Sequence, residues 1–438
     1  MAKRKIRLGI VCLTRNTFDF KAAEEIYRGI VKKLEAREDI SLAAFADPVM
    51  EIPQAIEAGE FLRREGAEAV AVVSGTFHLG GLVLEIKKRC DKPLLLWGLP
   101  ELPYNGGKIR LNSVCGVNLN ASNLFKSGYR DFAYKVSSDI DEDWLDAVRM
   151  ISALREGRIG VLGSRAHGFY NVGVDELALY RKYGCSVEFC ELSEAYSFDA
   201  DEKSVAEYRE RTDRLFDGSG VTEVQKDKVA VLCARLKAFM QARRFSALAV
   251  RCWPEFAAGF GIAPCASMSL LQDDGFVLAC EGDVDCALTM LCHKAAGADV
   301  PFMADISQVD DAAGTALMWH CGVAPRSLCA ADCTATLDTY FAGGRGVTAG
   351  FVMKCGRVEI ARLDSVNGKY RLYTETGTAV PMEKQLTGTY AKVKFDRPAK
   401  EVLDRVIYGG IAHHVSMVYG DYGKAFETFA RLTDTEIL

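Results

Sequence analysis

The chain has 438 residues, of which 49% are hydrophobic and 26% are charged, and its formal net charge is −5. This length exceeds one ordinary hydrophobic core, so we expect two or three domains. The slightly acidic balance gives no reason to expect a nucleic acid or an anionic membrane as a partner, and no apolar run is long enough to span a bilayer.

The N-terminus is basic and then apolar, which superficially resembles a secretion signal. Its apolar run is only about seven residues long and lacks a small-residue cleavage site, so a first β-strand is favoured. The fifteen cysteines are an odd number, lie mostly inside apolar runs and form no Cys-x-x-Cys motif. They favour reduced thiols and a cytoplasmic location, with structural zinc as the alternative.

Apolar runs with strand character alternate with helix-like stretches through the first part of the chain. Such alternation is typical of a doubly wound parallel sheet. We therefore predict an N-terminal α/β domain over residues 1–156. Its expected strands are 6–13, 41–46, 68–74 and 93–97, and its expected helices are 20–36, 54–65, 81–89 and 142–155.

The same pattern restarts at residue 157 and predicts a second α/β domain over 157–296. After residue 297 short β-like runs and turns dominate, so we predict a β-rich C-terminal domain over 297–438. The predicted fold class is therefore α/β, with two Rossmann-like doubly wound parallel-sheet domains followed by a β-rich domain. The strands expected after residue 157 are 158–163, 186–192, 247–250, 347–353, 357–362 and 387–395, and the helices are 174–183, 201–215 and 222–242.

Nucleotide-binding motifs are incomplete in this chain. Gly160 and Gly163 follow a strand, but the full Gly-x-Gly-x-x-Gly pattern that lets a backbone approach a pyrophosphate is missing. No Gly-x4-Gly-Lys-Ser/Thr loop occurs either. The two glycines are therefore interpreted as residues of tight turns.

Two acidic residues end short apolar runs in the middle of the chain. Glu281 ends the run 275–280, Asp305 ends the run 300–304, and a helix-like segment, 285–293, lies between them. Two strands joined by one helix would bring both carboxylates to the same end of a sheet, where ligands of open α/β sheets bind. This predicts a metal or acid–base site, the alternative being a helix cap and a loop acid.

A late segment, 409–421, contains the sequence Gly-Gly-Ile-Ala-His-His-Val-Ser-Met-Val-Tyr-Gly-Asp. Together with the segments around Glu281 and Asp305, in this order and spacing, it resembles the L-fucose isomerase family, with L-arabinose isomerases as more distant relatives. The resemblance is strongest over 245–310 and 409–421. This chain is shorter than the L-fucose isomerases.

The resemblance implies that Glu281 and Asp305 are both metal ligands and the acid–base pair, and that His414 completes the ligand set. Two carboxylates and one imidazole suit Mn(II) or a similar divalent ion. His413 and His414 would point to opposite faces of a strand, which favours only one of them as a ligand. His320 resembles a further histidine ligand of arabinose isomerases, the alternatives being a residue that orients the ligands or a half-buried histidine.

The resemblance also implies a sugar-binding set drawn from several strand ends and from a neighbouring subunit. Each of these residues has a plain structural alternative as a loop or core residue. The candidates for substrate binding are Arg15, Phe77, His78, Arg251, Trp253 and Tyr419.

The predicted function is a metal-dependent aldose–ketose isomerase that acts on an unphosphorylated sugar through an enediol. A deoxy, sulfonated or otherwise modified sugar is an open alternative to fucose and arabinose as the substrate. Another metal-assisted enediolate reaction, such as epimerisation, aldol cleavage or dehydration, is an alternative, as is a non-catalytic sugar-binding protein. The resemblance implies a homo-oligomer, a hexamer or a trimer, with sites at subunit interfaces.

Overall fold

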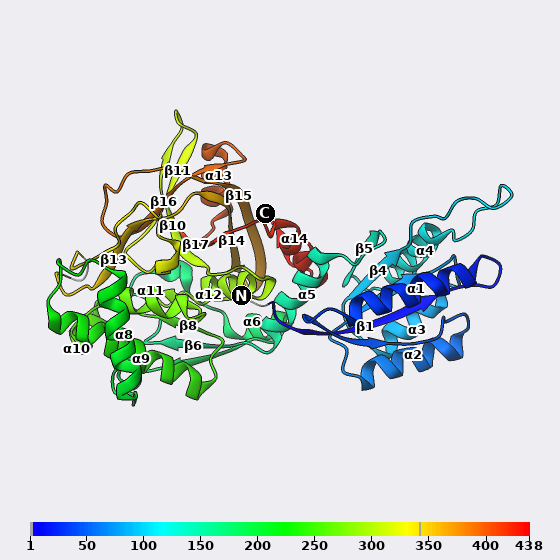
Figure 1. Ribbon diagram of the computed structural model, residues 1–438, viewed down its shortest axis with the longest axis horizontal. Helices are drawn as coiled ribbons and strands as arrows, with labels where there is room; N and C mark the ends of the chain where they lie inside the picture. The colour runs from blue at the N-terminus through cyan, green and yellow to red at the C-terminus, as the bar shows by residue number, and fades with distance from the viewer. Residues whose placement is uncertain (1–2, 341–342) are drawn as a thin grey trace. The chain divides into compact units, whose positions relative to one another are not determined.

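A computed structural model of the chain describes residues 3–340 and 343–438. The chain divides into two compact units (Figure 1). The N-terminal unit extends to Ser152 and takes in Lys424–Thr435, and the C-terminal unit comprises Ala153–Gly423 and Glu436–Leu438. Within the described ranges, no helix combines the length and the apolar character needed to cross a membrane.

Five parallel strands form the sheet of the N-terminal unit, in the order β2-β1-β3-β4-β5. The chain leaves β1 towards one edge and returns to the other, as in doubly wound sheets, so the predicted fold class is confirmed here. The strands are β1 (Ile6–Leu13), β2 (Ile40–Ala44), β3 (Ala69–Ser74), β4 (Leu94–Gly98) and β5 (Phe132–Val136). The helices are α1 (Phe20–Glu35), α2 (Ile52–Arg64), α3 (Gly81–Arg89), α4 (Ser113–Lys126), α5 (Glu142–Arg155) and, from near the chain end, α14 (Gly423–Thr433).

Three elements of this unit, α4, β5 and α14, have no counterpart in the predicted pattern. Helix α4 contains three asparagines, two serines and one glycine, which have low helix propensity. Strand β5 is an edge strand with no fully buried residue, so it lacks the apolar run that marks an inner strand.

A second parallel sheet, in the order β7-β6-β8-β9, opens the C-terminal unit and confirms the second Rossmann-like pattern. Its strands are β6 (Arg158–Leu162), β7 (Ser186–Cys190), β8 (Ala247–Val250) and β9 (Leu278–Cys280). The helices of this part are η1 (Tyr170–Val172), α6 (Glu176–Tyr183), α7 (Leu192–Tyr196), α8 (Glu202–Leu215), α9 (Glu223–Arg243), α10 (Glu255–Phe260), α11 (Cys265–Asp273) and α12 (Val284–Ala296).

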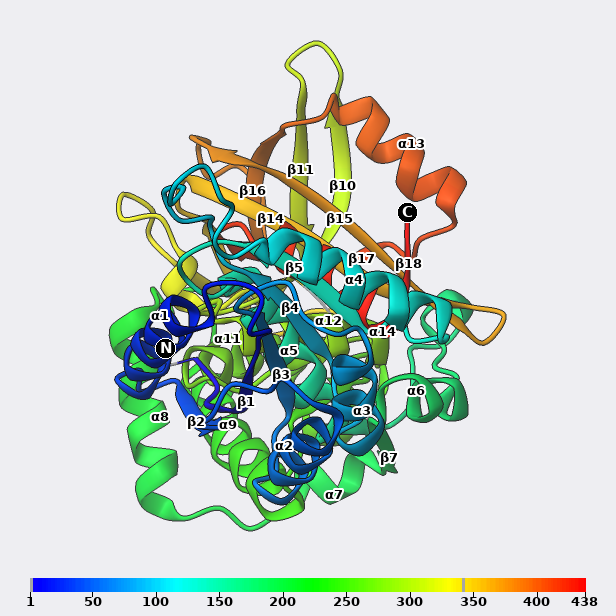
Figure 2. The same cartoon turned by 90° about the vertical axis from the view of Figure 1, so that its right-hand side faces the viewer.

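The predicted β-rich part forms a mixed nine-stranded sheet with an additional pairing between β15 and β16. This pairing joins β16, β11, β10, β17, β14 and β15 into a closed antiparallel ring (Figure 2). The strands are β10 (Phe302–Asp310), β11 (Thr315–His320), β12 (Thr336–Asp338), β13 (Thr348–Val352), β14 (Gly356–Val366), β15 (Lys369–Val380), β16 (Thr389–Phe395), β17 (His414–Tyr419) and β18 (Glu436–Ile437). The helices are η2 (Arg326–Leu328) and α13 (Ala399–Gly409).

Helix α12 connects the parallel sheet to the β-ring. It packs against β6 and β8 of the sheet and against β14 and β17 of the ring (Figure 1). Every residue of α12 except Lys294 is buried, as expected for a helix covered on all sides. The helix therefore holds the end of β9 next to the strands of the ring.

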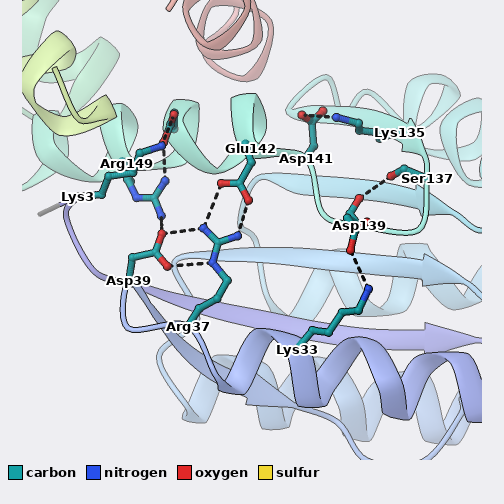
Figure 3. A network of polar contacts seen from close by, with 11 residues as sticks. Lys3, Lys33, Arg37, Asp39, Lys135, Ser137, Asp139, Asp141, Glu142 and Arg149 are labelled. Atoms are coloured by element: carbon teal, nitrogen blue, oxygen red, sulfur yellow. Dashed lines mark hydrogen bonds and ion pairs between the residues drawn. The ribbon is translucent and has the colours of Figure 1, made fainter.

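A network of ion pairs links the first and last parts of the N-terminal unit (Figure 3). The fully buried guanidinium of Arg149 pairs with Asp39 and with Asp146, each at 2.5 Å. Arg37 shares Asp39 at 2.8 Å and also pairs with Glu142. These contacts tie α5 to the turn between α1 and β2.

We expect Arg149→Met to lower the free energy of unfolding by about 3 kcal/mol, because it leaves Asp39 and Asp146 without their buried cation. Urea denaturation at neutral pH measures the change. Arg28→Met is the matched control, since Arg28 pairs with Glu24 at an exposed position of α1, and it should cost less than about 0.5 kcal/mol. Equal unfolding midpoints for the two variants would contradict the expectation.

Candidate metal centre

Glu281 follows β9 directly in a strained turn. Its φ is +60°, in the left-handed region that residues other than glycine seldom occupy. The N–H of Ala166 donates to the carbonyl of Glu281 at 2.9 Å, and the N–H of Gly282 donates to Val250 at 3.1 Å. A Cβ at Gly282 would lie 2.4 Å from the carbonyl oxygen of Ser164. Neighbouring backbone thus fixes a strain of the kind that concentrates at functional sites.

Asp305 and His414 lie directly opposite each other on the antiparallel strands β10 and β17. Because opposite residues share one face of a sheet, their side chains meet. Nε2 of His414 lies 3.7 Å from Oδ1 of Asp305. This Oδ1 is buried and has no hydrogen-bond partner. A buried oxygen without a partner calls for an explanation such as an ion that would bind there.

The expectation that Glu281 and Asp305 end two strands of the same sheet is wrong. Strand β9 belongs to the parallel sheet, whereas β10 belongs to the mixed sheet, and Asp305 lies inside β10 because the strand continues to Asp310. The two carboxylates still approach one histidine, since α12 holds the end of β9 against β17. Oε2 of Glu281 lies 3.2 Å from Nε2 of His414.

Five side chains with metal-binding donor atoms meet at this point. The donor atoms of Glu281, His413 and His414 lie within 4.8 Å of one another, as do those of Asp305, His320 and His414. His320 is 2% exposed, so it is buried and not half-buried as one alternative assumed. We call these five residues the donor cluster.

The expectation that His413 and His414 point to opposite faces of a strand does not apply here. His413 precedes β17, whose first residue is His414, so the two side chains are not forced to opposite faces. Their ring centroids are 3.9 Å apart, and Nε2 of His413 lies 3.9 Å from Oε2 of Glu281. Both histidines therefore face the same carboxylate.

Asp283 fixes the orientation of His414. Its carboxylate accepts a hydrogen bond from Nδ1 of His414 at 2.8 Å and another from Arg362 at 2.7 Å, and all three side chains are buried. Burial alone would raise the pKa of Asp283, but Arg362 and His414 hold that pKa well below its usual range. Because Nδ1 is hydrogen-bonded to Asp283, Nε2 is the ring nitrogen of His414 that faces Glu281 and Asp305 and that would bind a metal ion.

The sequence did not identify Asp283 or Arg362 as site residues. Asp283 stands just before a helix, and its side chain does accept from the N–H of Cys286 as a cap, so its position alone indicated only capping. Arg362 ends a predicted strand run, and only the pairing of β14 with β17 brings it to the site.

A loop after β6, residues 163–173, also reaches the donor cluster and carried no sequence signal. Phe169 packs edge-to-face against Trp253 and His413, with ring centroids 6.0 and 5.3 Å apart. Nδ2 of Asn171 lies 3.2 Å from Nδ1 of His413. The loop therefore lines one side of the site.

Three predicted substrate residues lie in the same unit as the donor cluster. The indole N–H of Trp253 donates to Oε1 of Glu281 at 3.2 Å. Arg251 follows β8 and pairs with Glu255. Tyr419 ends β17, and its hydroxyl donates to the carbonyl of Lys354. The contacts of these residues with a sugar stay predictions.

The other three predicted substrate residues, Arg15, Phe77 and His78, lie in the N-terminal unit after β1 and β3. The N–H of Arg15 donates to Thr76, and Phe77 packs against Phe18. Their contact with a sugar also stays a prediction.

The imidazole of His78 is fully buried, and both of its nitrogens contact polar groups of the N-terminal unit. Its Nε2 lies 3.2 Å from Oγ of Ser74, and its Nδ1 lies 3.2 Å from the carbonyl of Leu79. Burial lowers the pKa of His78 to about 4. The ring is therefore neutral at physiological pH.

The parallel sheets, the β-ring and the cluster of carboxylates and imidazoles define an α/β protein with a candidate metal centre. Residues 318–438 match the family model of the L-fucose isomerase C-terminal domain. Two proteins named sulfoquinovose isomerase, from Priestia aryabhattai and Priestia megaterium, are each 29% identical to the chain and cover 97% of it and 97% of their own length. A third of that name, from Alkalicoccus urumqiensis, is 26% identical, with 85% and 86% coverage.

These matches confirm the predicted resemblance: residues 318–438 are similar to the L-fucose isomerase C-terminal domain, and most of the chain is similar to proteins named sulfoquinovose isomerase. They also confirm the predicted class of enzyme, a sugar isomerase. Among solved structures, a periplasmic solute binding protein from Actinobacillus succinogenes with bound D-allose covers 57% of this chain and 78% of its own. Its sequence is 12% identical to this chain, and the TM-score of 0.18 is too low to indicate a shared fold.

We expect Asp283→Asn to weaken Mn(II) binding about 10- to 100-fold, because the substitution removes the charge that orients His414. Titration of the metal-free protein, followed by electron paramagnetic resonance, measures the affinity. Asp201→Asn is the control, since Asp201 caps α8 in the same way, at an exposed position, by accepting from the N–H of Ser204. If the two variants bind Mn(II) equally well, Asp283 does not position a ligand.

His78 makes the stability of the N-terminal unit depend on pH. The pKa of His78 is lower in the folded chain than in the unfolded chain. Between pH 6.5 and about 4 the unfolded chain therefore binds more protons, and the stability of the folded unit decreases as the pH is lowered. From pH 7 to pH 5 this group should cost about 2 kcal/mol. Amide hydrogen exchange of β3 measures the loss, which should shrink in His78→Gln. An equal loss in both proteins would refute this assignment.

Proposed function

We propose that the chain is a metal-dependent aldose–ketose isomerase acting on an unphosphorylated sulfonated sugar, with sulfoquinovose as the first candidate. The substrate proposal is supported by relatives of that name that align along 97% of the chain. The main support for a metal ion is the buried Oδ1 of Asp305, which faces His414 without a hydrogen-bond partner.

The donor cluster fits a divalent ion such as Mn(II). Ligand bonds of about 2.1–2.2 Å at right angles place neighbouring donor atoms about 3 Å apart. The distances of 3.2 Å from Glu281 to His414 and 3.7 Å from Asp305 to His414 are close to that spacing. Glu281, Asp305 and His414 would hold the ion, with His320 or His413 as a further ligand. The bound ion would supply positive charge to polarise the sugar oxygens on C1 and C2.

The chain's own residues would move the proton. Isomerisation transfers a hydrogen between C1 and C2 through an enediol, which requires a base that later returns the proton as an acid. Glu281 and Asp305 are the proposed pair. The indole of Trp253 donates to Oε1 of Glu281 and so holds the carboxylate in one orientation, while Asp283 holds the ring of His414.

We further propose a cytoplasmic homo-oligomer, a hexamer or a trimer, in which Arg15 and Phe77 of one subunit approach the sugar bound by another. All fifteen cysteines lie in the described part of the chain and are free thiols, which fits a reducing compartment. Light scattering on the purified chain measures the number of subunits.

We expect the protein to convert sulfoquinovose to its ketose only with a divalent ion. EDTA treatment should abolish turnover and Mn(II) should restore it, with the ketose identified by NMR in deuterated water. Glu281→Gln should reduce turnover at least about 1000-fold, because it removes both a ligand and a base.

Glu401→Gln is the control for this variant, since Glu401 is exposed on α13 of the same unit. Full activity in Glu281→Gln would refute the site. A C2 epimer, a cleaved sugar or a dehydrated sugar in place of the ketose would move the assignment to another reaction of the same enediolate chemistry.

A further inference from the structure

A cavity of about 340 Å³ lies at the carboxyl ends of β6 and β8, outside the donor cluster. These strands are neighbours in the order β7-β6-β8-β9, and the chain leaves β6 towards β7 before it returns on the other side at β8. Such a change of direction is where open α/β sheets bind ligands. The position alone marks the cavity as a candidate binding site.

The polar lining of this cavity includes two guanidinium groups and an imidazole. Arg165 and His167 come from the loop after β6, and Arg251 comes from the end of β8. Among the described residues that line the cavity, none is acidic. The hydroxyl-bearing Ser164 adds a further donor. The apolar remainder of the lining consists of Val161, Val172, Val174, Phe189 and Val284.

Both arginines keep donor groups that the fold does not use. In the part of the chain that the structure describes, Arg165 contacts the carbonyl of Ala166 at 3.4 Å and the ring of Tyr170 at 4.7 Å, but no carboxylate. Arg251 pairs with Glu255, yet its Nε is buried without a hydrogen-bond partner. A buried donor without an acceptor is costly, and Arg251 therefore carries one donor that its partners in the described residues do not satisfy.

The backbone holds these groups in place. Gly163 and Ser164 have φ values of +81° and +70°, and the close approach of Ser164 to Gly282 fixes the loop against the end of β9. The N–H of Ala166 donates to Glu281 itself. The loop therefore carries Arg165 on the cavity side and is bonded directly to the backbone of the donor cluster.

We propose that this cavity is a subsite for an oxyanion, a sulfonate or a phosphate, with Arg165 and Arg251 as its charged donors and Ser164 and His167 beside them. Planar forked guanidinium groups match the oxygen atoms of such anions. A dinucleotide is a poor fit because the glycine pattern for a pyrophosphate is missing. The oxyanion comes either from the sulfonate of the sugar, an assignment that rests on the proposed function, or from a separate ligand.

Isothermal titration of the metal-free full-length chain with methanesulfonate, and separately with inorganic phosphate, tests the subsite without any turnover. We expect saturable binding of at least one anion and a loss of about tenfold or more in Arg165→Gln and in His167→Gln, with a smaller loss in Arg165→Lys. Arg214→Gln removes the same charge from an exposed position on α8 and should bind like the parent. Absent saturable binding, or equal affinities in all variants, would overturn the proposal.

Kinetics with the Mn(II)-loaded enzyme then distinguish the two sources. If the sugar supplies the oxyanion, methanesulfonate competes with sulfoquinovose, and Arg165→Gln raises KM for sulfoquinovose about tenfold or more while Arg214→Gln leaves it unchanged. If a separate ligand supplies it, inhibition is not competitive. Anion binding without isomerisation of any sugar would refute the proposed function and leave the subsite standing.

Discussion

The candidate metal centre depends on one buried carboxylate, that of Asp283. It joins three segments that are distant in the sequence: the start of α12, strand β14 through Arg362, and strand β17 through His414. A buried carboxylate is costly unless cations and hydrogen-bond donors surround it. Asp283 has the guanidinium, the imidazole and the N-terminus of a helix around it. The positions of the site residues therefore depend on how these three segments pack in the core.

The turn at Glu281 adds a second constraint. A left-handed backbone at a glutamate is unfavourable by itself and persists only because β8 and the loop after β6 hold it. The same turn presents a carboxylate to the donor cluster on one side and the glycine at 282 to the cavity lined by Arg165 and Arg251 on the other. Both sites therefore depend on one short stretch of backbone.

Much of the fold could be predicted because the alternation of strands and helices is local information. Glu281, Asp305 and His414 could be chosen from the order and spacing of their motifs. The sheet that holds Asp305 could not be predicted, since an apolar run does not indicate whether its strand pairs in parallel or antiparallel. Arg362 and Asp283 stand 79 residues apart, and their contact exists only once β14 and β17 have paired.

The place of β17 within the β-ring has a consequence for the newly made chain. Strand β17 lies between β10 and β14, although both of these precede it by many residues. During synthesis, β10 and β14 each keep one unpaired edge until β17 has left the ribosome, and such edges are prone to pair with other chains. His414 arrives on the same strand, so a nascent chain cannot assemble its ligand set before the ring closes.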